Sequence, residues 1–291
     1  MAHRSGFVNI IGSPNVGKST LMNQMMGEKF SITTSKAQTT RHRILGIVND
    51  EDYQIVFSDT PGVLDPHYKL HENMMNYVNT ALKDGDVILF VTDIYEDGMK
   101  HEETLKRLKK TSIPILLLIN KIDQADQKTI EEKVEYWHNE IPKAEILPIS
   151  ALEGFNMEPI WKRILELIPE SPPYYDKDSI SDRPMRFFVS EMIREKIFLH
   201  YKKEVPYATQ VEVEEYLEDE DIIRIRAIIY VERKTQKGII IGHQGQKIKH
   251  VGIDARKDIQ KFVEKKVHLE LFVKVDENWR GNDQKLQKHG Y

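Results

Sequence analysis

The sequence of 291 residues predicts an α/β fold, with a doubly wound, mostly parallel sheet in a first domain and a smaller α+β domain after it. Three observations support this prediction. Apolar runs alternate with amphipathic segments in the first part of the chain, a glycine-rich loop follows the first apolar run, and a proline-rich stretch separates two patterns. Continuous apolar strands that alternate with helices are typical of a parallel sheet covered on both faces.

The first domain, residues 1–170, is expected to contain the strands of this sheet. Amphipathic segments between them, such as Thr104–Lys110 and Ile160–Ile168, are predicted to be helices. The predicted strands are all short apolar runs, and they are Phe7–Ile11, Ile44–Val48, Ile55–Phe57, Val87–Val91, Ile115–Ile119 and Ile146–Ile149.

The pattern changes after a stretch with four prolines, PESPPYYDKDSISDRP, so we predict a linker at residues 171–184. The second domain, residues 185–275, has a different predicted order of one helix, two strands, two helices and one strand. Residues 276–291 are expected to form a weakly ordered C-terminal tail. The predicted elements of the second domain are Phe188–Lys202, Ala208–Tyr216, Ile222–Glu232, the helical pair in Thr235–Val263, and His268–Val275.

Composition and charge exclude several classes of protein. The chain contains no cysteine, which excludes a disulfide framework, a thiolate zinc site, an iron–sulfur cluster and a cysteine nucleophile. Its apolar runs are far shorter than the ~20 residues that cross a bilayer, and the N-terminus lacks a signal-peptide pattern, so we expect a cytoplasmic protein. The net charge is −4, yet residues 224–291 carry 16 lysines and arginines against 8 acidic residues, as expected of a surface that meets polyphosphate.

The glycine-rich loop reads GSPNVGKS, and it lies between the strand Phe7–Ile11 and a helix expected at Lys18–Met26. This is the context in which the pattern GxxxxGK[ST] binds phosphate, because glycines let backbone N–H groups wrap phosphate oxygens. Lys18 is expected to reach the outer phosphates and Ser19 to bind Mg²⁺. The nucleotide-binding residues predicted here are Gly12, Ser13, Pro14, Asn15, Val16, Gly17, Lys18, Ser19 and Thr20.

Two further tetrapeptides follow predicted strands, DTPG and NKID, and Ser150 with Ala151 follows a third. Ligands of doubly wound sheets gather at such strand ends. Asp59 is placed to hold Mg²⁺ through water, and Asp123 can accept from both N1–H and the 2-amino group of guanine, which favours GTP over ATP. The predicted nucleotide-binding residues from these motifs are Asp59, Thr60, Pro61, Gly62, Asn120, Lys121, Asp123, Ser150 and Ala151.

The segment KAQTTRHRILGI, residues 36–47, lies where the γ-phosphate and Mg²⁺ would order the chain. We predict Mg²⁺ ligation by Ser19, Thr40 and Asp59, with Thr39 as the alternative threonine; both threonines could also simply lead into a strand. The residue after DTPG is Val63, which cannot orient water, so intrinsic hydrolysis should be slow, on the order of 10⁻³ to 10⁻⁴ s⁻¹. The residues expected to act in hydrolysis are Asn15, Lys18, Thr40 and Gly62.

In the second domain, residues 239–249 read IIIGHQGQKIK, a GxxG loop beside basic residues. Glycines at both positions let backbone amides approach nucleic-acid phosphates, although GxxG is also a common turn and the lysines could form a solvated helix face. With the predicted element order, the segment resembles a type II KH domain. The RNA-binding residues predicted are Ile241, Gly242, His243, Gln244, Gly245, Lys247, Lys249 and Arg256.

Nearly the whole chain resembles the Era family of bacterial ribosome-assembly GTPases. The resemblance rests on GSPNVGKST, KAQTTRHRI, DTPG, NKID and SAL in the first domain, and on IREK, IIIGHQGQKIK, GIDARKD and HLELFVKV in the second. It implies a GTP-hydrolysing switch that binds the 3′-terminal region of 16S rRNA through its KH domain in late 30S assembly. It also implies peripheral contact with the inner face of the cell membrane, and in this GTPase group an asparagine such as Asn15 helps to hold K⁺.

Two other interpretations remain open at this point. The chain could be an RNA-binding assembly factor in which nucleotide is only structural, or a relative of the tRNA-modification GTPases, which share the first-domain motifs. The residues predicted to sense the γ-phosphate, Lys18, Ser19, Thr40 and Asp59, argue against the first interpretation, and the KH-like second domain argues against the second. We expect a monomer.

Overall fold

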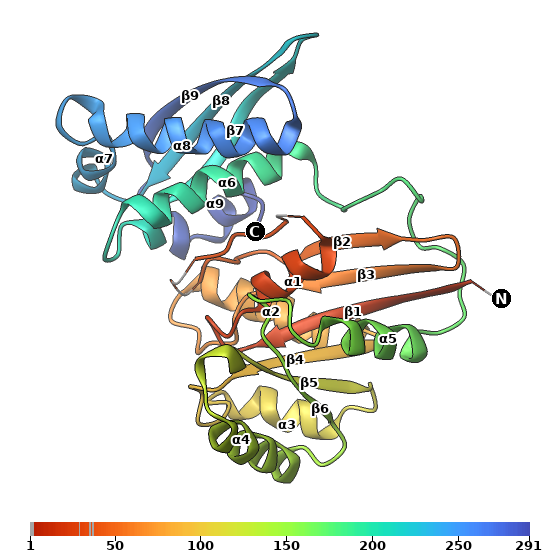
Figure 1. Ribbon diagram of the computed structural model, residues 1–291. Helices are drawn as coiled ribbons and strands as arrows, with labels where there is room; N and C mark the ends of the chain where they lie inside the picture. Colours follow the sequence, from red (N-terminus) through yellow and green to blue (C-terminus); the bar gives the residue numbers. More distant parts are fainter. Residues whose placement is uncertain (1–2, 29, 35, 37) are drawn as a thin grey trace. The chain divides into compact units, whose positions relative to one another are not determined.

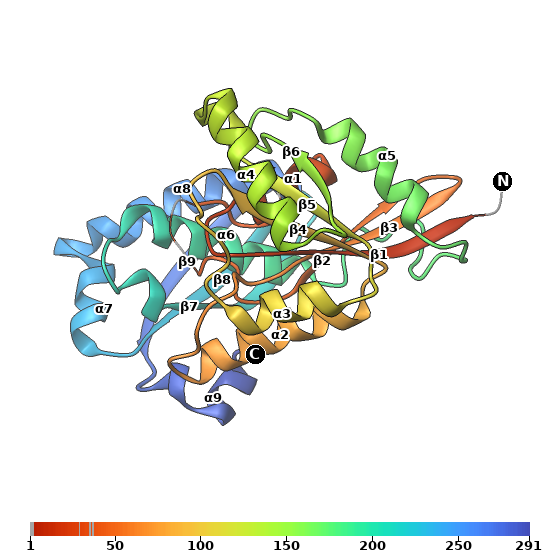
Figure 2. The same cartoon turned by 90° about the horizontal axis from the view of Figure 1, so that it is seen from below.

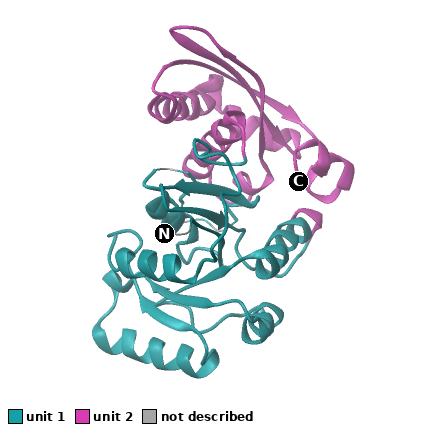
Figure 3. Ribbon diagram, turned by 90° about the vertical axis from the view of Figure 1, so that its right-hand side faces the viewer, with its two compact units in different colours: residues 1–67, 71–182 teal, residues 68–70, 183–291 magenta. Residues whose placement is uncertain are grey.

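The computed structural model describes residues 3–28, 30–34, 36 and 38–291. The chain divides into two compact units (Figure 3). The first comprises residues 1–67 and 71–182, and the second comprises residues 68–70 and 183–291.

The first unit contains a six-stranded sheet with the order β2-β3-β1-β4-β5-β6 (Figure 1). Strand β2 is antiparallel to β3 and the other neighbouring strands are parallel, which confirms the predicted doubly wound, mostly parallel sheet. All residues of β4 and β5 are buried, as expected for central strands covered on both faces. The strands are β1 (Arg4–Gly12), β2 (Ile44–Asn49), β3 (Tyr53–Asp59), β4 (Val87–Asp93), β5 (Ile115–Asn120) and β6 (Glu145–Pro148).

Helices cover both faces of this sheet. Apolar residues of α2, α3 and α4, among them Val78, Leu108 and Trp137, form one core with Phe90 and Leu117 of the central strands. Helices α1 and α5 lie on the opposite face, and Figure 2 shows α5 on the other side of the sheet from α2 and α3. The helical segments are α1 (Lys18–Met26), α2 (Lys69–Asp84), α3 (Glu102–Lys110), η1 (Ile122–Gln124), α4 (Gln127–Glu140) and α5 (Met157–Leu167).

The segment predicted as a linker packs against the edge of the sheet for much of its length. Ser181 forms a bridge with Gly46 of β2, and the Asn49 side chain donates to the Ser179 carbonyl at 3.0 Å. The Gln54 amide donates to the Tyr175 carbonyl at 2.8 Å. Because an edge strand leaves backbone groups unpaired, this stretch supplies partners that a free tether would not.

The second unit has a three-stranded sheet with the order β7-β8-β9, in which β7 is antiparallel and β9 parallel to β8. One face of the sheet packs on α6, α7 and α8 through residues such as Ile197, Ile240 and Ile259. The order of helix, two strands, two helices and strand confirms the α+β prediction. The elements are α6 (Met185–His200), η2 (Pro206–Ala208), β7 (Gln210–Glu218), β8 (Ile222–Val231), α7 (Lys234–Ile241), η3 (His243–Gly245), α8 (Gln246–Val263) and β9 (Lys266–Val275).

The expectation of a weakly ordered tail at residues 276–291 is wrong. Two short helices form there, η4 (Trp279–Gly281) and α9 (Asp283–Lys288). The Trp279 side chain is fully buried and donates to the Ala208 carbonyl at 3.0 Å, and Leu286 is also fully buried. The C-terminal Tyr291 hydroxyl donates to Gln210 of β7 at 2.7 Å. Few apolar side chains take part in anchoring the segment, so the sequence shows no periodicity that would reveal it.

Replacing Trp279 by Ala is expected to lower the free energy of unfolding of the second unit by about 3 to 5 kcal/mol, because the change leaves a large buried cavity. Urea denaturation followed by circular dichroism measures this loss. Gln284→Ala, an exposed position in the same segment, is the control and should change little. An unchanged urea midpoint in Trp279→Ala would show that the segment does not contribute to stability.

Candidate nucleotide-binding site and candidate RNA-binding surface

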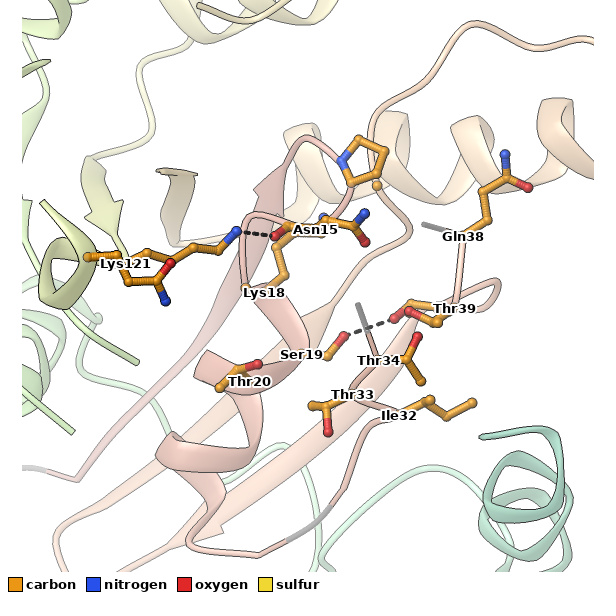
Figure 4. Close-up of a pocket in the computed structure, with 15 residues that line it drawn as sticks. Asn15, Lys18, Ser19, Thr20, Ile32, Thr33, Thr34, Gln38, Thr39 and Lys121 are labelled. Carbon is orange, nitrogen blue, oxygen red and sulfur yellow. Dashed lines mark hydrogen bonds between the residues drawn. The ribbon is translucent and has the colours of Figure 1, made fainter. Parts of the chain in front are cut away.

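A cavity of about 350 Å³ lies at the carboxyl ends of β1 and β3, where the sequence places the phosphate loop (Figure 4). It collects residues from four separate parts of the chain, namely the loop itself, the segment before β2, the residue Gly62 after β3, and the residues after β5. Its lining residues are Pro14, Asn15, Gly17, Lys18, Ser19, Thr20, Ile32, Thr33, Thr34, Gln38, Thr39, Thr40, Gly62, Lys121 and Gln124.

Two glycines of this region are required by close packing. Gly17 has φ = 101°, and a Cβ atom there would lie 2.1 Å from the Asn120 side-chain nitrogen. A Cβ atom on Gly62 would lie 2.8 Å from the Cα of Pro14. The DTPG motif and the phosphate loop therefore approach each other so closely that their backbone N–H groups can face one ligand.

Lys18 is buried within the phosphate loop. Its ammonium donates to the carbonyls of Gly12 at 3.0 Å and of Ser13 at 2.8 Å. Burial lowers the pKa of Lys18 to about 8, and the negative charges of Asp59 and Glu96 oppose this shift. A buried positive charge that is shielded from water is strongly stabilised by an anionic ligand. This agrees with the phosphate contact predicted for Lys18.

The three residues predicted to bind Mg²⁺ lie together. Ser19 Oγ donates to Asp59 Oδ2 at 2.8 Å and lies 3.0 Å from Thr40 Oγ1. Asp59 is fully buried, and its second oxygen, Oδ1, has no hydrogen-bond partner among the described residues. A buried carboxylate with an uncompensated oxygen, next to two hydroxyls, is the donor set that a hard divalent cation takes. The residues therefore fit Mg²⁺, and this geometry supports Thr40 as the threonine ligand.

The NKID and SAL motifs are joined by hydrogen bonds around the phosphate loop. The Asn120 side chain donates to the Val16 carbonyl at 2.8 Å and accepts from the Ala151 amide at 2.9 Å. Ser150 donates to Asp123 at 2.6 Å, and this bond holds the pKa of Asp123 below its usual range. Asp123 is therefore an ionised acceptor at neutral pH, as recognition of the two guanine donors requires.

Thr60 and Val16 are predicted nucleotide-binding residues whose side chains do not line the cavity. The Thr60 hydroxyl donates to the Ile10 carbonyl at 2.7 Å and is fully buried against β1. Val16 is buried as well. Only the backbone of these two residues is available to a ligand.

Asn23 of α1 is a residue that the motifs missed. Its Oδ1 accepts from the amides of Phe30 and Ser31 at 2.7 Å each, and its Nδ2 donates to the Ser31 carbonyl at 2.9 Å. One side chain thus fixes the start of the segment that carries Thr33 to Thr40. The available signal was the polar pair Asn23 and Gln24 within the otherwise apolar helix segment LMNQMM.

The GxxG sequence forms the connection between α7 and α8. Gly242 has φ = 71° and Gly245 has φ = 75°, and Gln244 between them has φ = 49°. A Cβ atom on Gly242 would lie 2.7 Å from the Lys247 side chain, whereas nothing lies within 4 Å of one on Gly245. The loop is therefore an exposed, glycine-dependent turn at the start of a basic helix.

A groove of about 390 Å³ runs between α8 and β9 after this loop. It brings together Lys249 and Arg256, two of the predicted RNA-binding residues, with His268, which the sequence analysis missed. Ile241, His243, Gln244 and Lys247 lie in or beside the GxxG turn and do not line the groove. The groove is also lined by Ile248, Gly252, Ile253, Leu269 and Leu271. An apolar floor with basic side chains at its rim suits unstacked bases and their phosphates.

Comparisons with known proteins cover both units. The family described as "50S ribosome-binding GTPase" matches residues 7–121, and the KH domain family matches residues 204–280. The chain is 45% identical to GTPase Era of Staphylococcus epidermidis, over 99% of this chain and 97% of that protein. It is 44% identical to GTPase Era of Alkaliphilus metalliredigens, over the full length of both.

Two crystal structures of Era resemble the whole chain, each with a TM-score of 0.94, 37% identity and 99% coverage of both chains. One contains Era with MgGDPNP and nucleotides 1506–1542 of 16S ribosomal RNA. The other contains a variant of Aquifex aeolicus Era bound to GDP·AlF4⁻.

Asn23→Ala is expected to lower the free energy of unfolding by about 1 to 3 kcal/mol, because it removes the side chain that bonds to the Phe30 amide and to both backbone groups of Ser31. Asn23→Asp keeps the acceptor and should lose less. Urea denaturation measures both, with the exposed neighbour Gln24→Ala as control. Equal stability of Asn23→Ala and the wild type would contradict the anchoring role.

Asp59→Asn is expected to stabilise the nucleotide-free, metal-free protein at pH 7. Burial raises the pKa of Asp59, so its ionised form costs folding free energy above that pKa. The advantage of the variant should shrink as the pH falls through the raised pKa, where the wild-type carboxyl is protonated and neutral. Melting temperatures from pH 4.5 to 8 test this; a variant less stable than the wild type at pH 7 would disprove it.

Proposed function

The chain belongs to the Era family of GTPases, and from this membership we propose that it is a GTP-dependent switch acting in late assembly of the 30S subunit. In this proposal it hydrolyses GTP to GDP and phosphate and binds 16S rRNA near its 3′ end through the KH domain. The observation that carries the proposal is the whole-chain similarity to an Era that was crystallised with MgGDPNP and nucleotides 1506–1542 of 16S rRNA.

The first unit supplies the groups that hold GTP. The phosphate loop surrounds the phosphates with backbone N–H groups, Lys18 contacts the outer phosphates, and Asp123 accepts from guanine. Ser19 and Thr40 would hold Mg²⁺ directly and Asp59 through water; the ion neutralises the charge that develops on the phosphates. Gly62 presents its backbone N–H to the terminal phosphate.

The intrinsic rate of GTP hydrolysis is expected to be low, because the residue after DTPG has no polar side chain to orient the attacking water. Val63 follows DTPG and is buried, so it cannot orient water as a glutamine would. Slow intrinsic hydrolysis suits a switch whose lifetime in the GTP form is set by other components. Asn15 is at the mouth of the cavity, beside Lys18, and we propose that it helps to hold K⁺ there.

GTP would act on RNA binding by ordering residues 30–41 and 59–72, of which residues 35 and 37 lie outside the described part of the chain. Loss of the γ-phosphate removes the contacts of Thr40 and Gly62 and releases these segments. A nucleotide shifts RNA affinity only if the two states differ in that affinity. The proposal therefore requires RNA binding to differ between the GTP and GDP forms.

The alternative is an RNA-binding assembly factor in which the nucleotide is only structural. Such a protein would bind RNA equally well in its GTP and GDP forms. The buried cluster of Ser19, Thr40 and Asp59 favours the switch, because a purely structural nucleotide has no need of residues that respond to the γ-phosphate.

A cytoplasmic location, a monomeric state and peripheral contact with the cell membrane complete the proposal. Among the helices that the structure describes, none is long and apolar enough to cross a membrane. Co-sedimentation with anionic vesicles tests the membrane contact. The molar mass from light scattering tests the monomeric state.

We expect the protein to bind an rRNA 3′-end oligonucleotide more tightly with a non-hydrolysable GTP analogue than with GDP, and more tightly than a scrambled sequence. Arg256→Ala should weaken binding by about 1 to 3 kcal/mol, because it removes a cation at the rim of the groove. Fluorescence anisotropy at fixed salt measures each affinity. Lys261→Ala, on the same helix but not lining the groove, is the control. Equal binding of both oligonucleotides in both nucleotide states would contradict the proposed function.

The rate of GTP hydrolysis is expected to be several-fold higher in K⁺ than in Na⁺ at equal ionic strength. Asn15→Gly should abolish the difference, because glycine tolerates the local φ of 66° but offers no side-chain oxygen. Phosphate release under single-turnover conditions measures these rates. Equal rates in the two salts for the wild type would exclude the K⁺ role.

A further inference from the structure

A carboxylate outside all the predicted motifs reaches the phosphate loop. Glu96 lies just after β4, and its two oxygens accept hydrogen bonds from the hydroxyls of Ser13 and Thr92, the latter at 2.8 Å. Ser13 is the second residue of the phosphate loop. Glu96 therefore connects this loop to the carboxyl end of a central strand.

The same turn holds the loop at a second point. Asp93 accepts from the Glu96 amide at 3.0 Å and from the Lys121 ammonium at 2.6 Å. Lys121 also donates to the Asn15 carbonyl at 2.8 Å. Residues 93–96 thus hold both neighbours of Pro14. Glu96 bonds directly to Ser13, and Asp93 holds Lys121, which bonds to Asn15.

The position of this carboxylate is electrostatically unfavourable for a site that takes a polyphosphate. Glu96 is partly buried, and burial raises its pKa while the hydrogen bonds from Ser13 and Thr92 oppose the shift. Its charge also acts on Lys18. A negative group so close to bound phosphates weakens their binding by repulsion, so its hydrogen bonds must provide a compensating benefit.

We propose that Glu96 is a positioning residue for the guanine nucleotide: by accepting from Ser13 it holds the phosphate loop in the shape that binds phosphates, and this bond limits the rate of nucleotide release. The inference rests on the GTP binding proposed above. It separates two properties of one side chain, because the acceptor oxygen tightens nucleotide binding whereas the negative charge weakens it.

The test is the release rate of a fluorescent GDP analogue, chased with excess GDP. Glu96→Ala and Ser13→Ala each remove the bond and are expected to release the analogue about tenfold faster than the wild type. The double variant should be no faster than the faster single variant, because both changes break one interaction. Glu96→Gln keeps an acceptor and loses the charge, so its release should be as slow as in the wild type or slower.

Asp97→Ala is the matched control. Asp97 is the next residue, is exposed, and pairs with Lys133 at 3.2 Å, so its removal should leave the release rate unchanged. Melting curves without nucleotide show whether each variant folds. If Glu96→Ala does not fold, the comparison of Ser13→Ala with Glu96→Gln tests the inference instead.

Three results would overturn the inference. These are wild-type release rates in the variants that lack the bond, independent effects that multiply in the double variant, or release from Glu96→Gln as fast as from Glu96→Ala. A wild-type protein that does not bind GDP would instead overturn the proposed function itself, and the inference with it.

Discussion

The phosphate loop has almost no room for side chains where it passes the carboxyl ends of β4 and β5, and the rest of the first unit depends on this constraint. A Cβ atom on Gly12 would lie 2.0 Å from the Val91 carbonyl oxygen, and one on Gly17 would collide with Asn120. Glycine at these two positions lets the backbone of the loop lie directly against Val91 of β4 and Asn120 of β5. The central sheet is therefore both the core of the unit and the support of the nucleotide site.

Charged groups are concentrated at this edge at a cost in stability. Lys18 and Asp59 are both buried. Burial lowers the pKa of Lys18 and raises the pKa of Asp59, so it favours the neutral form of each side chain. Their opposite charges counteract this effect of burial on each other. A bound nucleotide and its metal ion would add further charges beside them, and a ligand that binds only the folded state stabilises it.

The second unit also depends on glycines, which here shape an exposed turn. The GxxG turn uses positive φ values at Gly242 and Gly245 to start a helix whose first residues remain exposed to a polyanion. Below it, the groove beside α8 combines an apolar floor with Lys249 and Arg256. The C-terminal segment adds the fully buried side chain of Trp279, which donates to the Ala208 carbonyl, to the same small unit.

Much of this protein was determined by its sequence. Alternation of apolar runs with amphipathic segments specified the sheet, and the motifs from Gly12 to Ala151 specified the nucleotide site, because local spacing at strand ends dictates what meets there. Tertiary structure alone decided the contacts between residues that share no pattern in the sequence, such as Ser13 with the distant Glu96, and Asn23 with Ser31 eight residues later. A single hydrogen bond leaves no periodicity in a sequence, so only the folded chain reveals which polar residues hold the loop in place.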